Sequence, residues 1–138
     1  MDDLYKKSLN TLELPDVLSM LADYAVSDSG KKFALSVSPQ TSVSEVSASL
    51  EKTDDARKLI GIKGTPAFSG ICDVSESLAR AERGGSLNAG ELLRVAELLR
   101  TARGAQNYLE EDRRGEKTSL DNMFAGLLTD KSLEDSIT

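Results

Sequence analysis

Histidine and tryptophan are absent from this sequence of 138 residues, and cysteine occurs once, at Cys72. Without histidine, the chain lacks the commonest metal ligand and the usual proton carrier near neutral pH. A single cysteine forms no internal disulfide, which fits a reducing compartment. Asp73 follows Cys72 and disfavours a thiolate, so we interpret Cys72 as a partly buried structural residue. These absences predict neither a catalytic residue nor a metal site within the chain.

Aromatic residues are scarce as well. They make up 4% of the chain, and hydrophobic residues in total make up 39%. Leucine and alanine supply most of the apolar content, whereas the β-branched and aromatic residues that favour strands are few. We therefore predict an all-α fold of several helices with small residues at their contacts. The aromatic side chains expected to anchor the core are Tyr24, Phe33, Tyr108 and Phe124.

Long hydrophobic runs and an excess of basic residues are both missing. No apolar stretch approaches the length that crosses a membrane, and the N-terminus lacks the pattern of a secretory signal. The chain carries 23 acidic and 17 basic residues, a net charge of −6. Nucleic-acid binders are normally basic because they neutralise phosphates. We therefore expect a cytoplasmic protein, without membrane contact, that binds nucleic acid only weakly on its own.

Cap and proline signals divide the chain into helices, which we expect at residues 14–25, 31–37, 42–61, 73–83, 88–109 and 120–128. Three serine, aspartate or asparagine residues have the spacing of a capping box with a glutamate, in the pairs Ser42–Glu45, Asp73–Glu76 and Asn88–Glu91. The charged run 110–117 predicts a solvated turn. A last helix start at Ser132 meets the end of the sequence, so we expect a segment truncated at its C-terminus.

The run Gly85–Gly90 has the glycine spacing of a phosphate loop. Such a loop continues with lysine and then serine or threonine, which reach the phosphates and the magnesium ion. Glu91 and Leu92 stand there instead, and Glu91 would repel phosphate. We interpret this run as the stop of one helix and the start of the next, without cofactor binding.

Four arginines are the most informative charges, and they occur in two pairs with a spacing of three residues. That spacing places each pair on one helix face, so the sequence predicts weak phosphate contacts at Arg80, Arg83, Arg100 and Arg103. The alternative, which we favour, is pairing within each helix to Glu82 and Glu97.

Three stretches resemble the second bacterial MutS family (MutS-II). The run LELPDVLSMLADYAVSDSGKKFAL at 12–35 resembles the start of that family, and KTDDARKLI at 52–60 resembles its helix with a Thr-Asp-Glu-Ala-Arg pattern. The run GTPAFSGICDVSESLARAERGGSLNAGELLRVAELLRTAR at 64–103 resembles its Pro-Phe-Gly-Gly-Ile loop, a helix ending in two glycines and a leucine-rich helix. Ser69 departs from the usual glycine, and the likeness fades after Asn107.

This resemblance implies that residues 1–138 form a single helical N-terminal core segment of a longer protein. The resemblance implies that the longer protein is a dimeric ATPase that uses ATP and magnesium, binds branched DNA or ribosomes and carries a C-terminal nuclease domain. Members of the family are linked to suppressing recombination and rescuing stalled ribosomes. None of the family's catalytic motifs matches a residue here, so the resemblance implies a non-catalytic scaffold whose partners are the remaining domains of the same polypeptide.

A second hypothesis is a self-contained helical protein–protein interaction domain. The two hypotheses differ at the C-terminal apolar residues. A truncated segment should leave them without packing partners, whereas a complete domain should bury them; they are Leu127, Leu128, Leu133 and Ile137.

Overall fold

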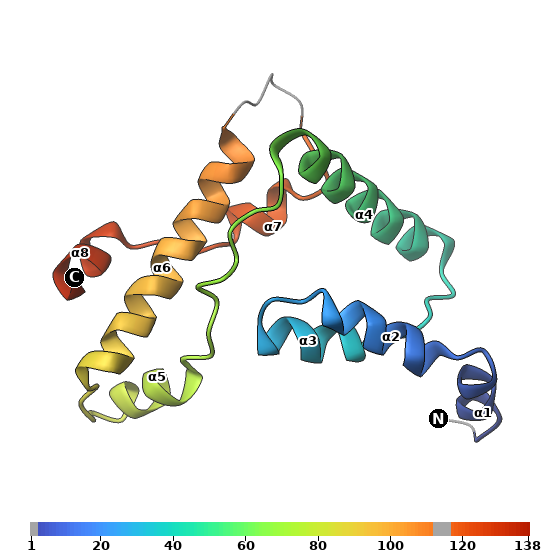
Figure 1. Ribbon diagram of the computed structural model, residues 1–138, viewed down its shortest axis with the longest axis horizontal. Helices are drawn as coiled ribbons and strands as arrows, with labels where there is room; N and C mark the ends of the chain where they lie inside the picture. The colour runs from blue at the N-terminus through green and yellow to red at the C-terminus, as the bar shows by residue number, and fades with distance from the viewer. Residues whose placement is uncertain (1–2, 112–116) are drawn as a thin grey trace. The chain divides into compact units, whose positions relative to one another are not determined.

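The computed structural model describes residues 3–111 and 117–138, and all regular secondary structure in these ranges is helical (Figure 1). The all-α prediction is confirmed. The charged turn predicted at 110–117 lies mostly outside the described residues. The helices are α1 (Asp3–Thr11), α2 (Leu14–Asp23), α3 (Asp28–Leu35), α4 (Val43–Lys63), α5 (Ser75–Glu82), α6 (Ala89–Glu110), α7 (Asp121–Ala125) and α8 (Lys131–Ile137).

The chain divides into two compact units. Unit 1 is Met1–Pro39 and contains α1, α2 and α3; unit 2 is Gln40–Thr138 and contains α4 to α8. The sequence predicted one helical segment over 1–138, and whether the two units act as one domain stays a prediction. Each unit is described by itself below.

Unit 1 is built on the packing of α2 against α3. Ala22 and Ala34 lie at this contact region with 7% of their surfaces exposed, and small side chains allow two helices to approach closely. Ser27 caps α3 because its hydroxyl accepts a hydrogen bond from the backbone N–H of Gly30 at 3.0 Å. This cap starts α3 at Asp28, three residues before the predicted start.

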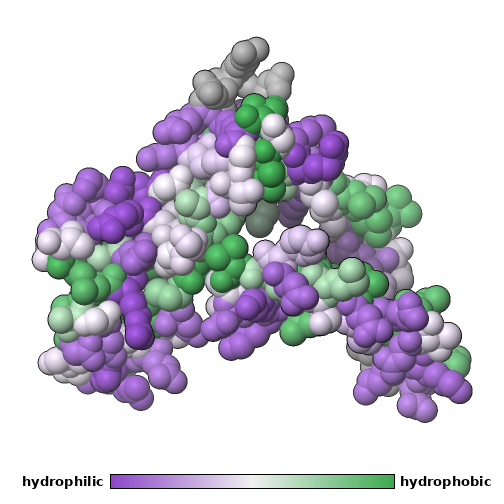
Figure 2. Space-filling view, viewed as in Figure 1, coloured by the Kyte–Doolittle hydropathy of each residue, from purple (hydrophilic) through white to green (hydrophobic). Residues whose placement is uncertain are grey.

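Two of the predicted core anchors are wrong. Tyr24 is 87% exposed and Phe33 is 74% exposed, both in unit 1. Helical periodicity predicts an apolar face but not the element that packs on it, and none of the described residues of unit 1 buries these two side chains. Tyr108 and Phe124, in unit 2, are half-buried. Hydrophobic residues lie among hydrophilic ones at the molecular surface (Figure 2).

Unit 2 is organised around the long helix α6. Helices α7 and α8 pack directly against it, as Figure 1 shows. The buried apolar residues of unit 2 are small or leucine-sized, and they are Val74, Ala96, Ala105, Leu109 and Leu120. The segment between α4 and α5 also approaches α6 closely. A Cβ atom at Gly70 would lie 2.2 Å from Thr101 Oγ1, so this contact requires glycine.

The capping predictions have mixed outcomes. Asn88 and Glu91 form both hydrogen bonds of a capping box at the start of α6, as predicted. Ser42 occupies the N-cap of α4 but makes no capping bond, since its hydroxyl pairs with the Ser44 hydroxyl at 2.9 Å. The box predicted for Asp73 and Glu76 is wrong, because Val74 occupies the N-cap of α5 and makes no side-chain capping bond. Asp73 instead accepts a hydrogen bond from the backbone N–H of Ser75 at 2.9 Å.

The end of the chain also differs from the prediction. Asp130, and not Ser132, caps α8, because its carboxylate accepts a hydrogen bond from the backbone N–H of Leu133 at 2.9 Å. Helix α7 ends at Ala125, before the two leucines that we expected within it. Leu128 is 88% exposed and Leu133 is 45% exposed. The other two C-terminal apolar residues, Leu127 and Ile137, are half-buried.

Candidate functional site on helix α6

Polar side chains of α6 contact three other parts of unit 2. Near its N-terminus Glu91 contacts α5, in its middle Arg100 and Arg103 contact α8, and near its C-terminus Tyr108 contacts the end of α4. These contacts join residues that are between 11 and 45 positions apart in the sequence. We call this set the α6 network.

The first contact of the α6 network is centred on the carboxylate of Glu91. It pairs with the guanidinium group of Arg80 and accepts hydrogen bonds from the Ser77 hydroxyl at 3.1 Å and the Asn88 backbone at 2.9 Å. The Asn88 N–H, followed by Arg80 and Ser77, lowers the pKa of Glu91. One carboxylate thus caps α6 and fastens α5 to it.

The second contact places one carboxylate against two arginines. Glu134 of α8 is 3% exposed. Arg103 Nη2 donates to its two carboxylate oxygens at 2.9 and 3.2 Å, and Arg103 Nε donates at 3.2 Å. Arg100 Nε donates to Oε1 at 3.1 Å. These guanidinium groups, with Arg103 the main cause, lower the pKa of Glu134.

The third contact joins the end of α4 to the end of α6. Lys63 Nζ donates to the carbonyl oxygen of Tyr108 at 2.8 Å and lies 5.5 Å from the centre of the Tyr108 ring. The Tyr108 hydroxyl in turn donates to the carbonyl oxygen of Gly64 at 2.8 Å. Gly64 has a φ of 79°, which glycine adopts without steric cost and which ends α4 here.

A further polar contact holds α4 to the segment before α7. The carboxylate of Asp55 accepts hydrogen bonds from both the backbone N–H and the hydroxyl of Ser119, each at 2.8 Å. These two bonds, the backbone bond first, lower the pKa of Asp55. The neighbouring Asp54 instead pairs with Arg57 and Lys58 on its own helix.

The predicted arginine pairs are separated between two helices, Arg80 and Arg83 at α5 and Arg100 and Arg103 on α6. Pairing with Glu82 and Glu97 is wrong for three of them, because Arg80 pairs with Glu91 and the α6 arginines pair with Glu134. Arg83 Nε donates to the carbonyl oxygen of Ala79 at 3.0 Å. Weak phosphate contact at these four arginines stays a prediction.

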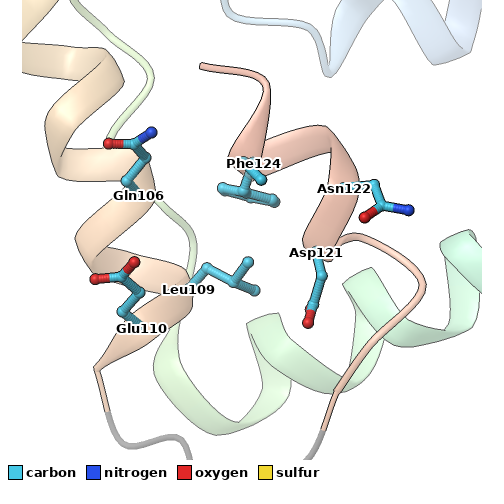
Figure 3. A pocket seen from close by; sticks show the side chains of 7 residues that line it. Gln106, Leu109, Glu110, Asp121, Asn122 and Phe124 are labelled. Carbon is cyan, nitrogen blue, oxygen red and sulfur yellow. The ribbon is translucent and has the colours of Figure 1, made fainter. Parts of the chain in front are cut away.

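Two hollows border α6. A cavity of about 240 Å³ lies between α6 and α7, where Leu109 and Phe124 point toward one another and Gln106, Glu110, Asp121 and Asn122 line the rim (Figure 3). A larger, polar groove of about 670 Å³ lies between α5 and α6 and includes Arg80, Arg83, Glu91 and Arg94. Asp73 and Glu76 also line this groove, so its acidic and basic side chains balance. The charge of the groove therefore favours neither cations nor anions.

The other sequence predictions concern the glycine run and the cysteine. Gly84 has a φ of 82° and follows the end of α5, and Asn88 starts α6, so the run is a helix stop and start as predicted. Cys72 is half-buried, and its thiol donates to the carbonyl oxygen of Arg94 at 3.7 Å. Within residues 3–111 and 117–138, no group of three or more acidic or cysteine side chains has an arrangement that would hold a metal ion.

None of the described helices combines the length and the apolar character needed to cross a lipid bilayer. No protein-family model matches the chain.

Individual relatives match nearly the whole chain. A protein named endonuclease MutS2 from Acetivibrio thermocellus is 37% identical over 136 residues, which cover 96% of this chain and 17% of that protein. Proteins of the same name from Clostridium perfringens and Lachnospira eligens are 33% and 35% identical, over 94% and 96% of this chain. They are themselves covered to 17% and 16%, so the chain spans about a sixth of the length of these relatives. This chain is therefore a segment that resembles the MutS2 endonucleases, as the likeness to the second bacterial MutS family predicted.

Proposed function

We propose that this chain is a non-catalytic helical scaffold segment of a MutS2-like protein. The observation that carries this proposal is the α6 network. Its charged side chains are engaged in contacts that fasten α5, α8 and the end of α4 to one long helix. We expect helices fastened in this way to shift together when one of them is displaced.

The resemblance supports a wider proposal for the longer protein to which such a segment would belong. We propose that it is a cytoplasmic, homodimeric ATPase with a nuclease domain, which uses ATP and magnesium outside this chain. Its target would be branched DNA or the ribosome, and its role would be suppression of recombination or rescue of stalled ribosomes. In that protein the segment would connect the nucleotide state to the nucleic-acid grip.

The alternative is a self-contained helical protein–protein interaction domain. The exposed apolar face of unit 1 favours it, since Met20, Tyr24 and Phe33 are between 65% and 87% exposed. Met20 and Tyr24 are four positions apart at the end of α2, a spacing that places them on one side of the helix. Large exposed apolar residues grouped in this way are typical of surfaces that meet another protein. Both proposals require a partner that covers this surface. In the scaffold proposal the partner is another part of the same polypeptide, and in the alternative it is a separate protein.

The first test compares this chain with the longest product of the same reading frame. Both are assayed for ATP hydrolysis and for binding to a labelled DNA junction over a range of salt concentrations. We expect the chain alone to hydrolyse no ATP and to bind DNA weakly, with the binding lost as salt rises. Tight, salt-resistant binding by the chain alone would contradict the scaffold proposal.

A sharper test uses a matched pair of variants in the longer product. Asp55→Asn weakens the bonds that join α4 to Ser119, whereas Asp54→Asn removes the same charge from a residue whose partners are on its own helix. We expect Asp55→Asn to reduce the stimulation of ATP hydrolysis by DNA several-fold, with little change in the unstimulated rate. If both variants leave the same stimulation of ATP hydrolysis by DNA, the contact of α4 with Ser119 does not connect DNA binding to ATP hydrolysis.

A further inference from the structure

We propose that Arg100 and Arg103 form a phosphate-binding site that the carboxylate of Glu134 occupies in this structure, with α8 acting as its removable cover. The site lies wholly within this chain, so the inference does not depend on the scaffold proposal. Its ligand class is a phosphate group, either in a small polyphosphate or in a nucleic-acid backbone.

The geometry of the pair suits an oxyanion. Arg103 presents Nε and Nη2 to the two oxygens of Glu134, with three contacts between 2.9 and 3.2 Å, and Arg100 adds a fourth at 3.1 Å. A guanidinium group binds carboxylates and phosphates through the same planar set of donors. Glu134 therefore occupies the position that two oxygens of a phosphate would take.

The arginines remain open to solvent although the carboxylate is covered. The side chain of Arg100 is 54% exposed and that of Arg103 is 34% exposed, whereas that of Glu134 is 4% exposed. An approaching anion therefore meets the guanidinium groups at the surface before any part of α6 has to move. Displacing the carboxylate requires only that α8 swings away.

Helix α8 packs against α6, and Glu134 is the only buried residue of its helical residues. Of its two apolar side chains, Ile137 is half-buried and Leu133 is 45% exposed. Lys131 and Asp135 pair with each other. The preceding loop is tied to α6 by Gln106 Nε2, which donates to the carbonyl oxygen of Leu127 at 2.8 Å. The buried part of the contact between α8 and α6 is thus a charged pair, which a competing anion and salt both weaken.

The decisive variant is Glu134→Gln, which removes the competing charge and keeps the size of the side chain. Binding of inorganic pyrophosphate and of a short labelled DNA duplex is measured at low salt. We expect the variant to bind at least one of these probes about tenfold tighter than the original chain does, a change of one decade in Kd. Adding Arg103→Gln to this variant should abolish the gain.

The matched control is Asp135→Asn, which removes the same charge from the same helix but leaves the contact of Glu134 with both arginines in place. A gain for pyrophosphate identifies small polyphosphates as ligands, and a gain for the duplex alone identifies the nucleic-acid backbone. The proposal is overturned if Glu134→Gln binds both probes no better than the Asp135→Asn control.

A second measurement decides the matter if Glu134→Gln fails to fold. Pyrophosphate is added to the unmodified chain, and hydrogen exchange is followed in α8 and α6. We expect exchange to accelerate in α8 and to remain unchanged in α6, because the anion displaces Glu134 from the arginines. Unchanged exchange in α8 at high pyrophosphate concentration would overturn the proposal.

Discussion

The two units of this chain are held together in different ways. Among the described residues of unit 1, only Ala22 and Ala34 are buried, and the large side chains of Met20, Tyr24 and Phe33 are mostly exposed. The described part of unit 2 buries five apolar residues and adds polar contacts between segments that are far apart in the sequence. The contacts of unit 1 are therefore local, whereas those of unit 2 are largely non-local.

This difference has a consequence for stability. A unit that buries little apolar surface has little free energy to lose on opening, so it opens first. We expect unit 1 to exchange its backbone hydrogens faster than α6 and to depend on a partner for full order.

The largest effect is expected in the core of unit 2. Leu109 is 4% exposed, so Leu109→Ala should lower the free energy of unfolding of unit 2 by about 2–3 kcal/mol, through lost burial and a cavity. Met20→Ala in unit 1 is the control; since Met20 is 65% exposed, it should change stability by less than about 0.5 kcal/mol. Urea denaturation followed by circular dichroism measures both. Similar losses would mean that the two units are equally well packed.

The next effect separates two glycines of unit 2. A Cβ at Gly70 would meet Thr101 Oγ1 at 2.2 Å and Glu97 Cγ at 2.9 Å, so Gly70→Ala should destabilise unit 2 by about 1–3 kcal/mol. Gly61 lies within α4 with nothing within 4 Å of such a Cβ. Gly61→Ala should therefore stabilise the helix by up to about 1 kcal/mol. Thermal unfolding of the two variants gives shifts of opposite sign if the segment around Gly70 packs on α6 as described.

A smaller effect distinguishes the two predicted capping boxes that start long helices. Asn88→Ala removes both the side-chain acceptor for Glu91 N–H and the box around it, and should cost about 1 kcal/mol. Ser42→Ala should cost only a few tenths of that amount, because Ser42 makes no capping bond. If both substitutions cost the same in chemical denaturation, the Ser42 hydroxyl caps α4 in solution.

The smallest effect is a dependence on pH. The pKa of Glu134 is lowered in the folded chain, chiefly by Arg103. Its stabilising contribution is therefore present above the ordinary glutamate pKa of 4.5 and is lost as the pH falls through the lowered value. Hydrogen exchange in α8, measured between about pH 7 and pH 3, should accelerate at the acidic end relative to a neutral reference. The Glu134→Gln variant should lack this component of the acid response.

Local signals in the sequence predicted much of the fold. Helix α6 begins where Asn88 was predicted to cap it, and such a cap involves residues only three positions apart. The cap at Ser27 has the same spacing but was missed, so α3 was expected to begin three residues too late. Helix α1 was missed because no cap or proline signal marks it. Tyr24 and Phe33 were assigned to the core because periodicity identifies an apolar face without identifying what covers it.

The α6 network was beyond this kind of prediction. Arg100 and Glu134 are 34 positions apart, and Tyr108 and Gly64 are 44 positions apart, so only the folded chain brings them together. The sequence directed attention to the right arginines but to the wrong acidic partners. A search for glutamates three or four positions away on the same helix favours local pairs over these distant ones.

The contact between Lys63 and Tyr108 also makes the chain well suited to spectroscopy. The sequence has no tryptophan and three tyrosines, and only Tyr108 belongs to unit 2. Desolvation raises the pKa of Tyr108, so its phenol should ionise at a higher pH than a free tyrosine. Replacing Tyr5 and Tyr24 by phenylalanine would leave Tyr108 as the single tyrosine, which absorbs more strongly and at longer wavelength than phenylalanine. Its absorbance and fluorescence would then report directly whether the ends of α4 and α6 are joined.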